Sequence, residues 1–206
     1  MNIIEFRKRL APFQLISLQD VRKAAPDLSY RQLDRWAKKE YLSKVHRGFY
    51  LLAGQPVDRQ FLFHAANRIY PPSYVSLEAA LKYYGLIPEE TFQITSVSTR
   101  KTIRFDTSLG GFSYRHLKPG LFFGYRLLEL GNRKVLLAEP EKALLDYLYF
   151  TPSLQSADDF RSLRIDRGQF AEQVNPKRLA ELAGAFAQKS LQRRAKLFLT
   201  TVENDA

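Results

Sequence analysis

The stretch from Ser17 to Leu52 constrains the fold of this chain more than any other. Ser17 can cap a helix over residues 18–25, and Pro26-Asp27-Leu28 ends that helix with residues suited to a turn. A second helix is expected to begin at Ser29, because Ser29-Tyr30-Arg31-Gln32 has the spacing of a capping box. The stretch therefore predicts two short capped helices joined by a tight turn.

A β-hairpin is predicted directly after the second helix. The segments 42–45 and 49–52 are rich in residues that favour strands, and His46-Arg47-Gly48 separates them. Gly48 can take the positive φ that a tight turn needs. Two helices, a turn and a basic hairpin in this order are typical of a winged helix-turn-helix, in which the hairpin is the wing.

The second helix has one apolar face and one basic face. Leu33, Trp36 and Ala37 share the apolar face, so we expect Trp36 to be structural. The opposite arc is cationic and is free to enter a groove of duplex DNA, where the first residues of such a helix reach the base edges. The residues predicted to bind DNA are Ser29, Tyr30, Arg31, Gln32, Arg35, Lys38, Lys39, Lys44, His46 and Arg47.

A simpler explanation is available for the basic arc, since cations on a helix often form a solvated face. That explanation accounts for the helix alone. It does not account for a capped helix, a turn, a capped basic helix and a basic hairpin occurring together, which favours DNA binding.

The charge distribution points to the same segment. The chain of 206 residues has a net charge of +11. Residues 1–53 hold 11 Lys and Arg against 5 Asp and Glu, so more than half of the excess lies in about a quarter of the chain. A local positive field attracts polyanions, which makes double-stranded DNA the expected partner of this segment.

Composition also excludes several classes. The absence of cysteine rules out disulfides and thiol nucleophiles. No apolar run approaches the roughly 18 residues of a membrane helix, and Glu5 and Arg7 interrupt the N-terminus too early for a signal peptide. We therefore expect a cytoplasmic protein with no membrane partner.

The rest of the chain predicts a second domain. Gly54-Gln55-Pro56 breaks the hairpin pattern, which divides the chain into residues 1–54 and residues 55–206. Helices are expected over 59–70, 76–84, 139–150 and, in pieces, beyond Pro152. Strands are expected over 91–97, 102–105, 111–117, 121–130 and 134–138. The fold class is α+β: a winged helix-turn-helix followed by a mixed α/β domain with a small, mostly antiparallel sheet.

Catalytic chemistry has little support in the sequence. His46, His64 and His116 lie far apart and none has a histidine partner at helical spacing, so no metal site is expected. Gly110-Gly111 lacks the lysine and helix start of a phosphate-binding loop and predicts a turn. We expect no enzyme activity and no cofactor. An alternative is that aromatic residues of the sheet stack on single-stranded bases, through Phe105, Tyr114, Phe122, Phe123 and Tyr125.

Six short segments carry a family resemblance through their order and spacing. They are Val45-His46-Arg47-Gly48-Phe49-Tyr50, Tyr74-Val75-Ser76-Leu77-Glu78-Ala79-Ala80-Leu81, Thr99-Arg100-Lys101, Tyr114-Arg115-His116-Leu117, Phe123-Gly124-Tyr125 and Ala138-Glu139-Pro140-Glu141-Lys142-Ala143-Leu144-Leu145-Asp146. Together they resemble the AbiEi-type antitoxins of abortive-infection, type IV toxin–antitoxin systems.

The resemblance implies a protein with two tasks. The winged helix would bind inverted repeats in its own promoter, as monomers on cooperating repeats or as an oligomer, and the C-terminal domain would counteract a nucleotidyltransferase-like toxin. Repression and toxin control would then separate near Gly54. Two alternatives stay open: a winged-helix regulator that responds to a small ligand, and an enzyme that acts on nucleic acid.

Overall fold

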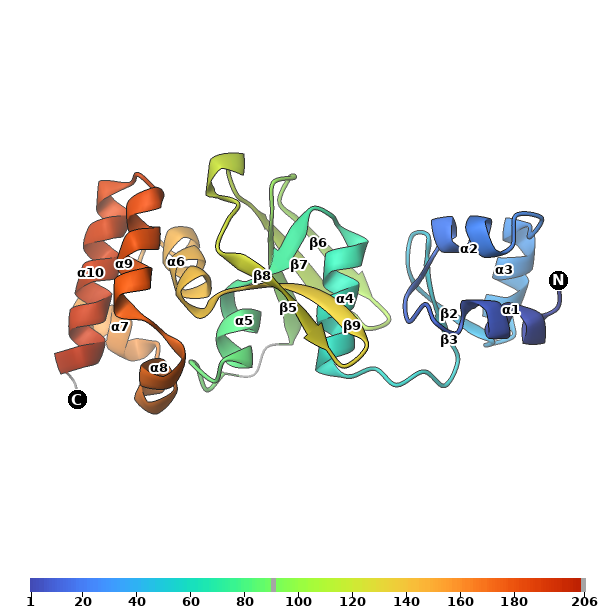
Figure 1. Ribbon diagram of the computed structural model, residues 1–206, viewed down its shortest axis with the longest axis horizontal. Coiled ribbons are helices and arrows are strands. Elements are labelled where there is room, and N and C mark those ends of the chain that lie inside the picture. Colours follow the sequence, from blue (N-terminus) through green and yellow to red (C-terminus); the bar gives the residue numbers. More distant parts are fainter. Residues whose placement is uncertain (90–91, 205–206) are drawn as a thin grey trace.

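The computed structural model describes residues 1–89 and 92–204 and shows three parts in a row (Figure 1). An N-terminal segment of helices and a small sheet lies at one end, a six-stranded sheet lies in the middle, and a group of helices lies at the other end. The fold is therefore mixed α/β. None of the helices in these described ranges is both long and apolar enough to cross a membrane.

The N-terminal segment contains three helices and a three-stranded antiparallel sheet. Its elements are α1 (Ile3–Leu10), β1 (Ile16–Ser17), α2 (Leu18–Ala24), α3 (Tyr30–Lys38), β2 (Leu42–His46) and β3 (Phe49–Leu52), with strand order β1-β3-β2. Ser17 caps α2 in a capping box with Asp20, and the Ser29 side chain accepts from the Gln32 amide. The predicted helices and hairpin are confirmed, whereas α1 and β1 were not expected.

A small core holds this segment together. It consists of Phe6, Leu10, Ile16, Val21, Leu33, Trp36, Leu42 and Tyr50. Trp36 is only 4% exposed, and its ring lies 4.9 Å from the ring of Phe6 on α1. The prediction that Trp36 faces the core is therefore confirmed, and the docked side of α3 is apolar as its pattern requires.

The middle sheet has the order β6-β7-β5-β4-β9-β8. Its strands are β4 (Ser73–Val75), β5 (Gln93–Ser98), β6 (Ile103–Thr107), β7 (Gly110–His116), β8 (Tyr125–Leu130) and β9 (Arg133–Ala138). The expected sheet was small and mostly antiparallel, but the observed one is mixed, because β5 pairs with β7 and β4 pairs with β9 in parallel. The strand predicted over 91–97 begins outside the described residues.

Two strands differ locally from the prediction. The strand β4 has three residues, all buried, and is too short to show a periodic pattern, yet it joins the two halves of the sheet. The strand predicted over 121–130 starts only at Tyr125. A 3-10 turn, η1 (Pro119–Leu121), precedes it, and Gly124 takes a φ of +71°.

Helices cover the sheet and form the far end of the molecule (Figure 1). α4 (Arg59–Ile69) contacts β4 and β9, while α5 (Leu77–Tyr83) contacts β5 and α6 (Pro140–Phe150). Beyond them lie α7 (Ala157–Ser162), α8 (Arg167–Gln173), α9 (Pro176–Ala185) and α10 (Lys189–Asn204). Asn175 caps α9 and Pro176 lies in its first turn, which agrees with the helices expected beyond Pro152.

The N-terminal segment packs against the middle sheet. Leu15, Val45 and Leu51 belong to the same buried cluster as the sheet residues. Arg68 of α4 donates to Asp20 of α2 at 2.7 Å, in a partly buried ion pair. Burial acts to raise the pKa of Asp20, but hydrogen bonds from the Ser17 hydroxyl and amide, and then the pairing with Arg68, hold it below its ordinary value. The two parts are thus joined by apolar and ionic contacts.

A completely buried ion pair lies where the sheet meets α6. Lys142 and Asp146, one helical turn apart, are both 0% exposed and bond to each other. Asp146 Oδ2 accepts from the Tyr74 hydroxyl at 2.9 Å and from Ser76 Oγ at 2.8 Å. This network connects α6 to the central strand β4 and gives the buried carboxylate hydrogen-bond donors as well as a cation.

Candidate nucleic-acid interface

The exposed side of α3 is the first part of the candidate site. The cap at Ser29 fixes where the helix starts, and the burial of Leu33 and Trp36 fixes its rotation. Arg31, Arg35, Lys38 and Lys39 are then all exposed. Within the described part of the chain, none of these four side chains forms an ion pair, so their charges are available to an anion.

A cation from α2, which sequence reasoning missed, lies beside the start of α3. Arg22 of α2 donates a hydrogen bond to the Tyr30 hydroxyl, and its guanidinium lies 5.8 Å from the centre of that ring. Tyr30 is 49% exposed. The available signal was the position of Arg22 in the last turn of the preceding helix, where it points out of the domain core. Gln32 is half-buried, and the Ser29 hydroxyl is occupied by the cap.

The turn of the β2–β3 hairpin is the second part of the site. Gly48 has a φ of +78°, as predicted, and its carbonyl accepts from the Leu18 amide at 2.9 Å. A Cβ added at Gly48 would lie 3.3 Å from Leu18 Cδ1, so the turn is held against the start of α2. Lys44 and Arg47 are exposed on this hairpin.

His46 behaves differently from the other predicted contacts. Its ring lies 4.3 Å from the ring of Phe105 on β6, centre to centre. Burial and the neighbouring charge of Arg47 lower the pKa of His46, which keeps the ring neutral at pH 7. The structure therefore places His46 at the contact between the hairpin and the middle sheet, where it adds no positive charge.

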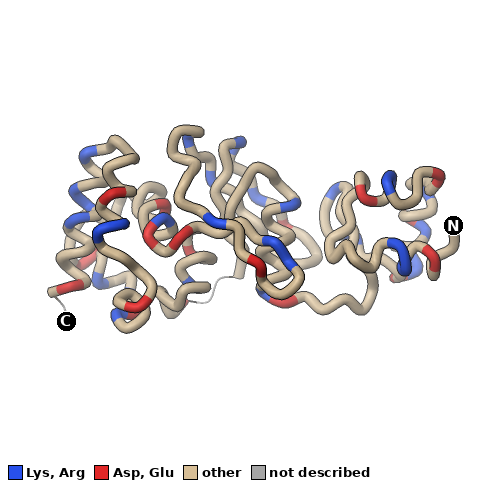
Figure 2. The backbone as a smooth tube through the Cα atoms, viewed as in Figure 1, with Lys and Arg blue, Asp and Glu red and all other residues tan. Residues whose placement is uncertain are grey.

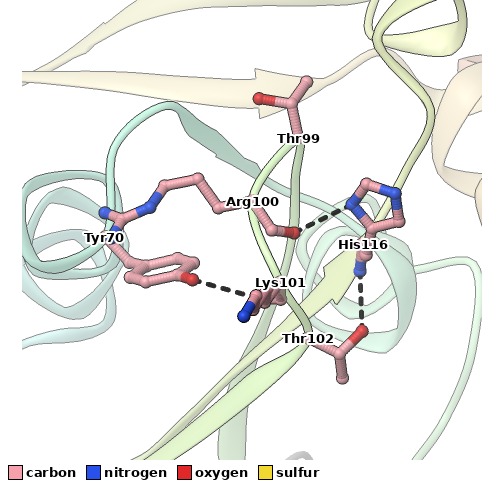
Figure 3. A pocket seen from close by; sticks show the side chains of 6 residues that line it. All are labelled: Tyr70, Thr99, Arg100, Lys101, Thr102 and His116. Carbon is pink, nitrogen blue, oxygen red and sulfur yellow. Dashed lines mark hydrogen bonds between the residues drawn. The ribbon is translucent and has the colours of Figure 1, made fainter.

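An open hollow lies on the sheet beyond this contact, with a volume of about 600 Å³ (Figure 3). It is lined by Tyr70, Thr99, Arg100, Lys101, Thr102 and His116. These residues come from the end of α4, the β5–β6 loop and the end of β7, three segments that are distant in sequence. In the sequence, Thr99-Arg100-Lys101 and His116 stand out only through the family resemblance.

The described residues contain no group of three or more His, Asp or Glu side chains that could hold a metal ion. Histidine 64 contacts the Lys134 carbonyl at 3.0 Å through Nδ1. Glu141 accepts from the Asn175 amide at 2.7 Å, which ties α6 to α9. These contacts give the two side chains structural partners.

The aromatic residues considered for single-strand binding are mostly internal. Tyr114 is 0% exposed, and its hydroxyl donates to the Ala66 carbonyl at 2.8 Å. Phe105, Phe122, Phe123 and Tyr125 are partly buried and pack against the main core. Contacts with neighbouring rings, such as Phe105 with His46 and Tyr125 with Tyr74, give these residues a packing role.

No protein-family model and no curated protein matches the chain. Among solved structures, it is similar to the crystal structure of the RV2827C protein from Mycobacterium tuberculosis. The TM-score is 0.62 at 15% sequence identity, and the match covers 97% of this chain and 76% of that one. At this identity the similarity shows that the two chains share a fold.

Proposed function

We propose that this protein binds double-stranded DNA through a winged helix-turn-helix formed by residues 1–54. The observation that carries the proposal is the exposed basic face of α3, which contacts β2 and is followed in the chain by a hairpin with exposed cations. α3 is the recognition helix of this arrangement, and the β2–β3 hairpin is its wing. Tyr30, Arg31 and Gln32 are the proposed base readers, because they form the first turn of the helix.

The number and position of the cations favour a role in binding duplex DNA over a helix face that is only solvated. Three cations on α3, a fourth at its C-cap Lys39, and two on the hairpin have no ion-pair partner among the described residues, so they can neutralise several phosphates and release their counterions. Arg22, held at the start of α3 by Tyr30, adds a further cation beside the proposed base readers. Such a surface predicts binding that weakens steeply as salt is added.

The proposed cellular role combines repression with toxin control. We infer that the protein represses its own promoter by binding inverted repeats, and that residues 55–206 counteract a nucleotidyltransferase-like toxin. The support for the toxin partner is the resemblance of the six segments to AbiEi-type antitoxins. A gene for such a toxin next to this one in the genome is the observation that this part requires.

The DNA-binding part is tested on promoter DNA by fluorescence anisotropy. The variant Arg31→Ala/Arg35→Ala/Lys38→Ala/Arg47→Ala removes four exposed cations from α3 and the wing. A matched control, Lys177→Ala/Lys189→Ala/Arg193→Ala/Lys196→Ala, removes four exposed cations from α9 and α10. The first variant should lose most of its affinity and the control should not. If both bind like the unmodified protein, α3 and the wing are not the DNA-binding surface.

A further inference from the structure

The hollow next to the wing has the chemistry of an anion site (Figure 3). Arg100 and Lys101 bring cationic nitrogen atoms to it, and Thr99 and Thr102 bring hydroxyl groups. None of its six lining residues, all of which lie in the described ranges, is acidic. Within the described residues, neither Arg100 nor Lys101 is in an ion pair, so the local positive charge is not neutralised.

Arg100 is held in a defined orientation. Its guanidinium lies over the Tyr70 ring, 4.0 Å from the centre, and Nη1 donates to the Pro71 carbonyl at 3.3 Å. An arginine has five N–H donors, so this single bond leaves a planar set free for phosphate oxygens. Because stacking already restricts the side chain, less conformational entropy is lost when an anion binds.

The backbone around Arg100 is also fixed. The Arg100 amide donates to Ser98 Oγ at 3.1 Å, and the Tyr70 hydroxyl donates to the Lys101 carbonyl at 3.1 Å. His116 Nδ1 donates to the Arg100 carbonyl at 2.9 Å, which leaves Nε2 without a partner in the described residues. The His116 amide donates to Thr102 Oγ1 at 3.0 Å, so the hydroxyl hydrogen of Thr102 is free to donate.

A series of ring contacts joins this hollow to the wing. The ring of Tyr70, which stacks against Arg100, lies 5.8 Å from the ring of Phe105, centre to centre. The ring of Phe105 in turn lies 4.3 Å from that of His46 on β2. The hollow therefore lies close to the hairpin that we propose as the wing. Figure 2 shows blue Lys and Arg segments on both the N-terminal segment and the middle sheet, with red Asp and Glu segments between them.

We propose that this hollow binds a backbone phosphate of the duplex that α3 and the wing engage. The inference rests on the DNA-binding function proposed above. The hollow is open, and most of its lining side chains are exposed, which suits a passing strand better than an enclosed small molecule. The middle sheet would then extend the DNA-binding surface past the wing.

The test compares two duplexes of arbitrary sequence, one that spans only the α3 and wing footprint and one that continues past the wing. The variant is Arg100→Ala/Lys101→Ala in the full chain, and the matched control is Arg193→Ala/Lys196→Ala on α10. On the longer duplex the variant should lose about tenfold in affinity, and the slope of log K against log[salt] should fall by about 0.9 for the lost phosphate. The shorter duplex should bind the variant and the control alike.

Further variants keep the test decisive. Arg100→Lys retains the charge, so the salt slope should stay close to that of the unmodified chain while affinity falls several-fold through the lost planar donors. If the double variant unfolds, Lys101→Glu changes one exposed side chain and should reduce the slope on the longer duplex alone.

The outcomes separate the two proposals. An unchanged slope for Arg100→Ala/Lys101→Ala, together with lost binding for the α3 and wing variant, overturns this inference and leaves the proposed function standing. If the unmodified chain binds neither duplex, the proposed function fails as well. Inorganic phosphate is titrated in parallel by NMR. Phosphate-dependent shifts at His116 with unaltered duplex binding would assign the hollow to a free phosphate and overturn the DNA assignment.

Discussion

The buried pair Lys142–Asp146 gives the sharpest prediction about stability. Lys142→Met keeps the length of the side chain among the rings of Tyr74, Phe123 and Phe186, which lie 5.4, 5.4 and 4.9 Å from its Nζ. It also leaves a carboxylate without its cation inside the core. Breaking a buried pair in this way costs about 3–5 kcal/mol. For a chain of this size, that corresponds to a fall in Tm of roughly 10 °C.

A second variant and a control test the cause. In Lys142→Met/Asp146→Asn both charges are gone, while the Asn carbonyl oxygen still accepts from Tyr74 and Ser76. This variant should recover about 2 kcal/mol or more of the loss, because no uncompensated charge remains. The control, Arg9→Met, breaks an exposed pair of the same spacing with Glu5, which contributes at most about 1 kcal/mol.

The effect should also depend on pH. Burial raises the pKa of Asp146, and Lys142 opposes that rise, so the single variant raises the pKa further. A carboxyl group whose folded pKa lies above its unfolded pKa destabilises the fold at neutral pH, and this penalty disappears as pH falls to the unfolded value near about 4. Urea unfolding followed by circular dichroism should therefore show a smaller difference from the unmodified chain at pH 4.5 than at pH 7. A pH-independent difference, or a single variant no less stable than Arg9→Met, would refute the reasoning.

Three further predictions follow from single sites. Trp36→Ala should lower the free energy of unfolding by about 3–5 kcal/mol, measured by urea titration, since the ring is buried; unchanged stability with lost DNA binding would place the ring on the wrong side of α3. Arg31→Ala should cost about 1–3 kcal/mol in binding and relax preference at one base position, while Lys39→Ala weakens all sequences alike, as competition assays with altered operators would show. Gly124→Ala should destabilise more than Gly131→Ala in thermal melts. Both glycines have positive φ, but only at Gly124 would a Cβ meet a side chain at 3.0 Å, so equal losses would contradict the packing argument.

The predictable part of the fold is the part that local sequence specifies. The helix α3 depends on its own cap and its own apolar stripe, and both are visible in residues 29–38. The turn at Gly48 is likewise a local signal. The strand β4 gives no such signal, because its three residues owe their conformation to β5 and β9 on either side. Tertiary pairing decides its structure, and with it the mixed character of the sheet.

The candidate site shows the same limit. Exposure of Arg31 and Arg35 follows from helical periodicity, so it was predictable. The position of His46 was not, because its partner Phe105 lies on a strand about 60 residues further along. The hollow that contains Arg100 and His116 joins three segments through a cation–π contact and backbone bonds, and no spacing in the sequence indicates it.

The contact between the N-terminal segment and the sheet determines how the two proposed tasks can be separated. Leu15, Val45 and Leu51 are at most 6% exposed within the main cluster, and burial of each such side chain contributes about 1.5–3 kcal/mol. A chain that begins at residue 55 would lose these contacts and with them part of its stability. If such a chain failed to neutralise the proposed toxin, the assay would not distinguish lost function from lost stability. The four-residue α3 and wing variant avoids this, because its side chains are exposed. It should melt like the unmodified protein, fail to shift promoter DNA, and still restore growth to cells that express the toxin proposed above. If this stable variant no longer restores growth, DNA binding and toxin control are not separate functions of the two segments.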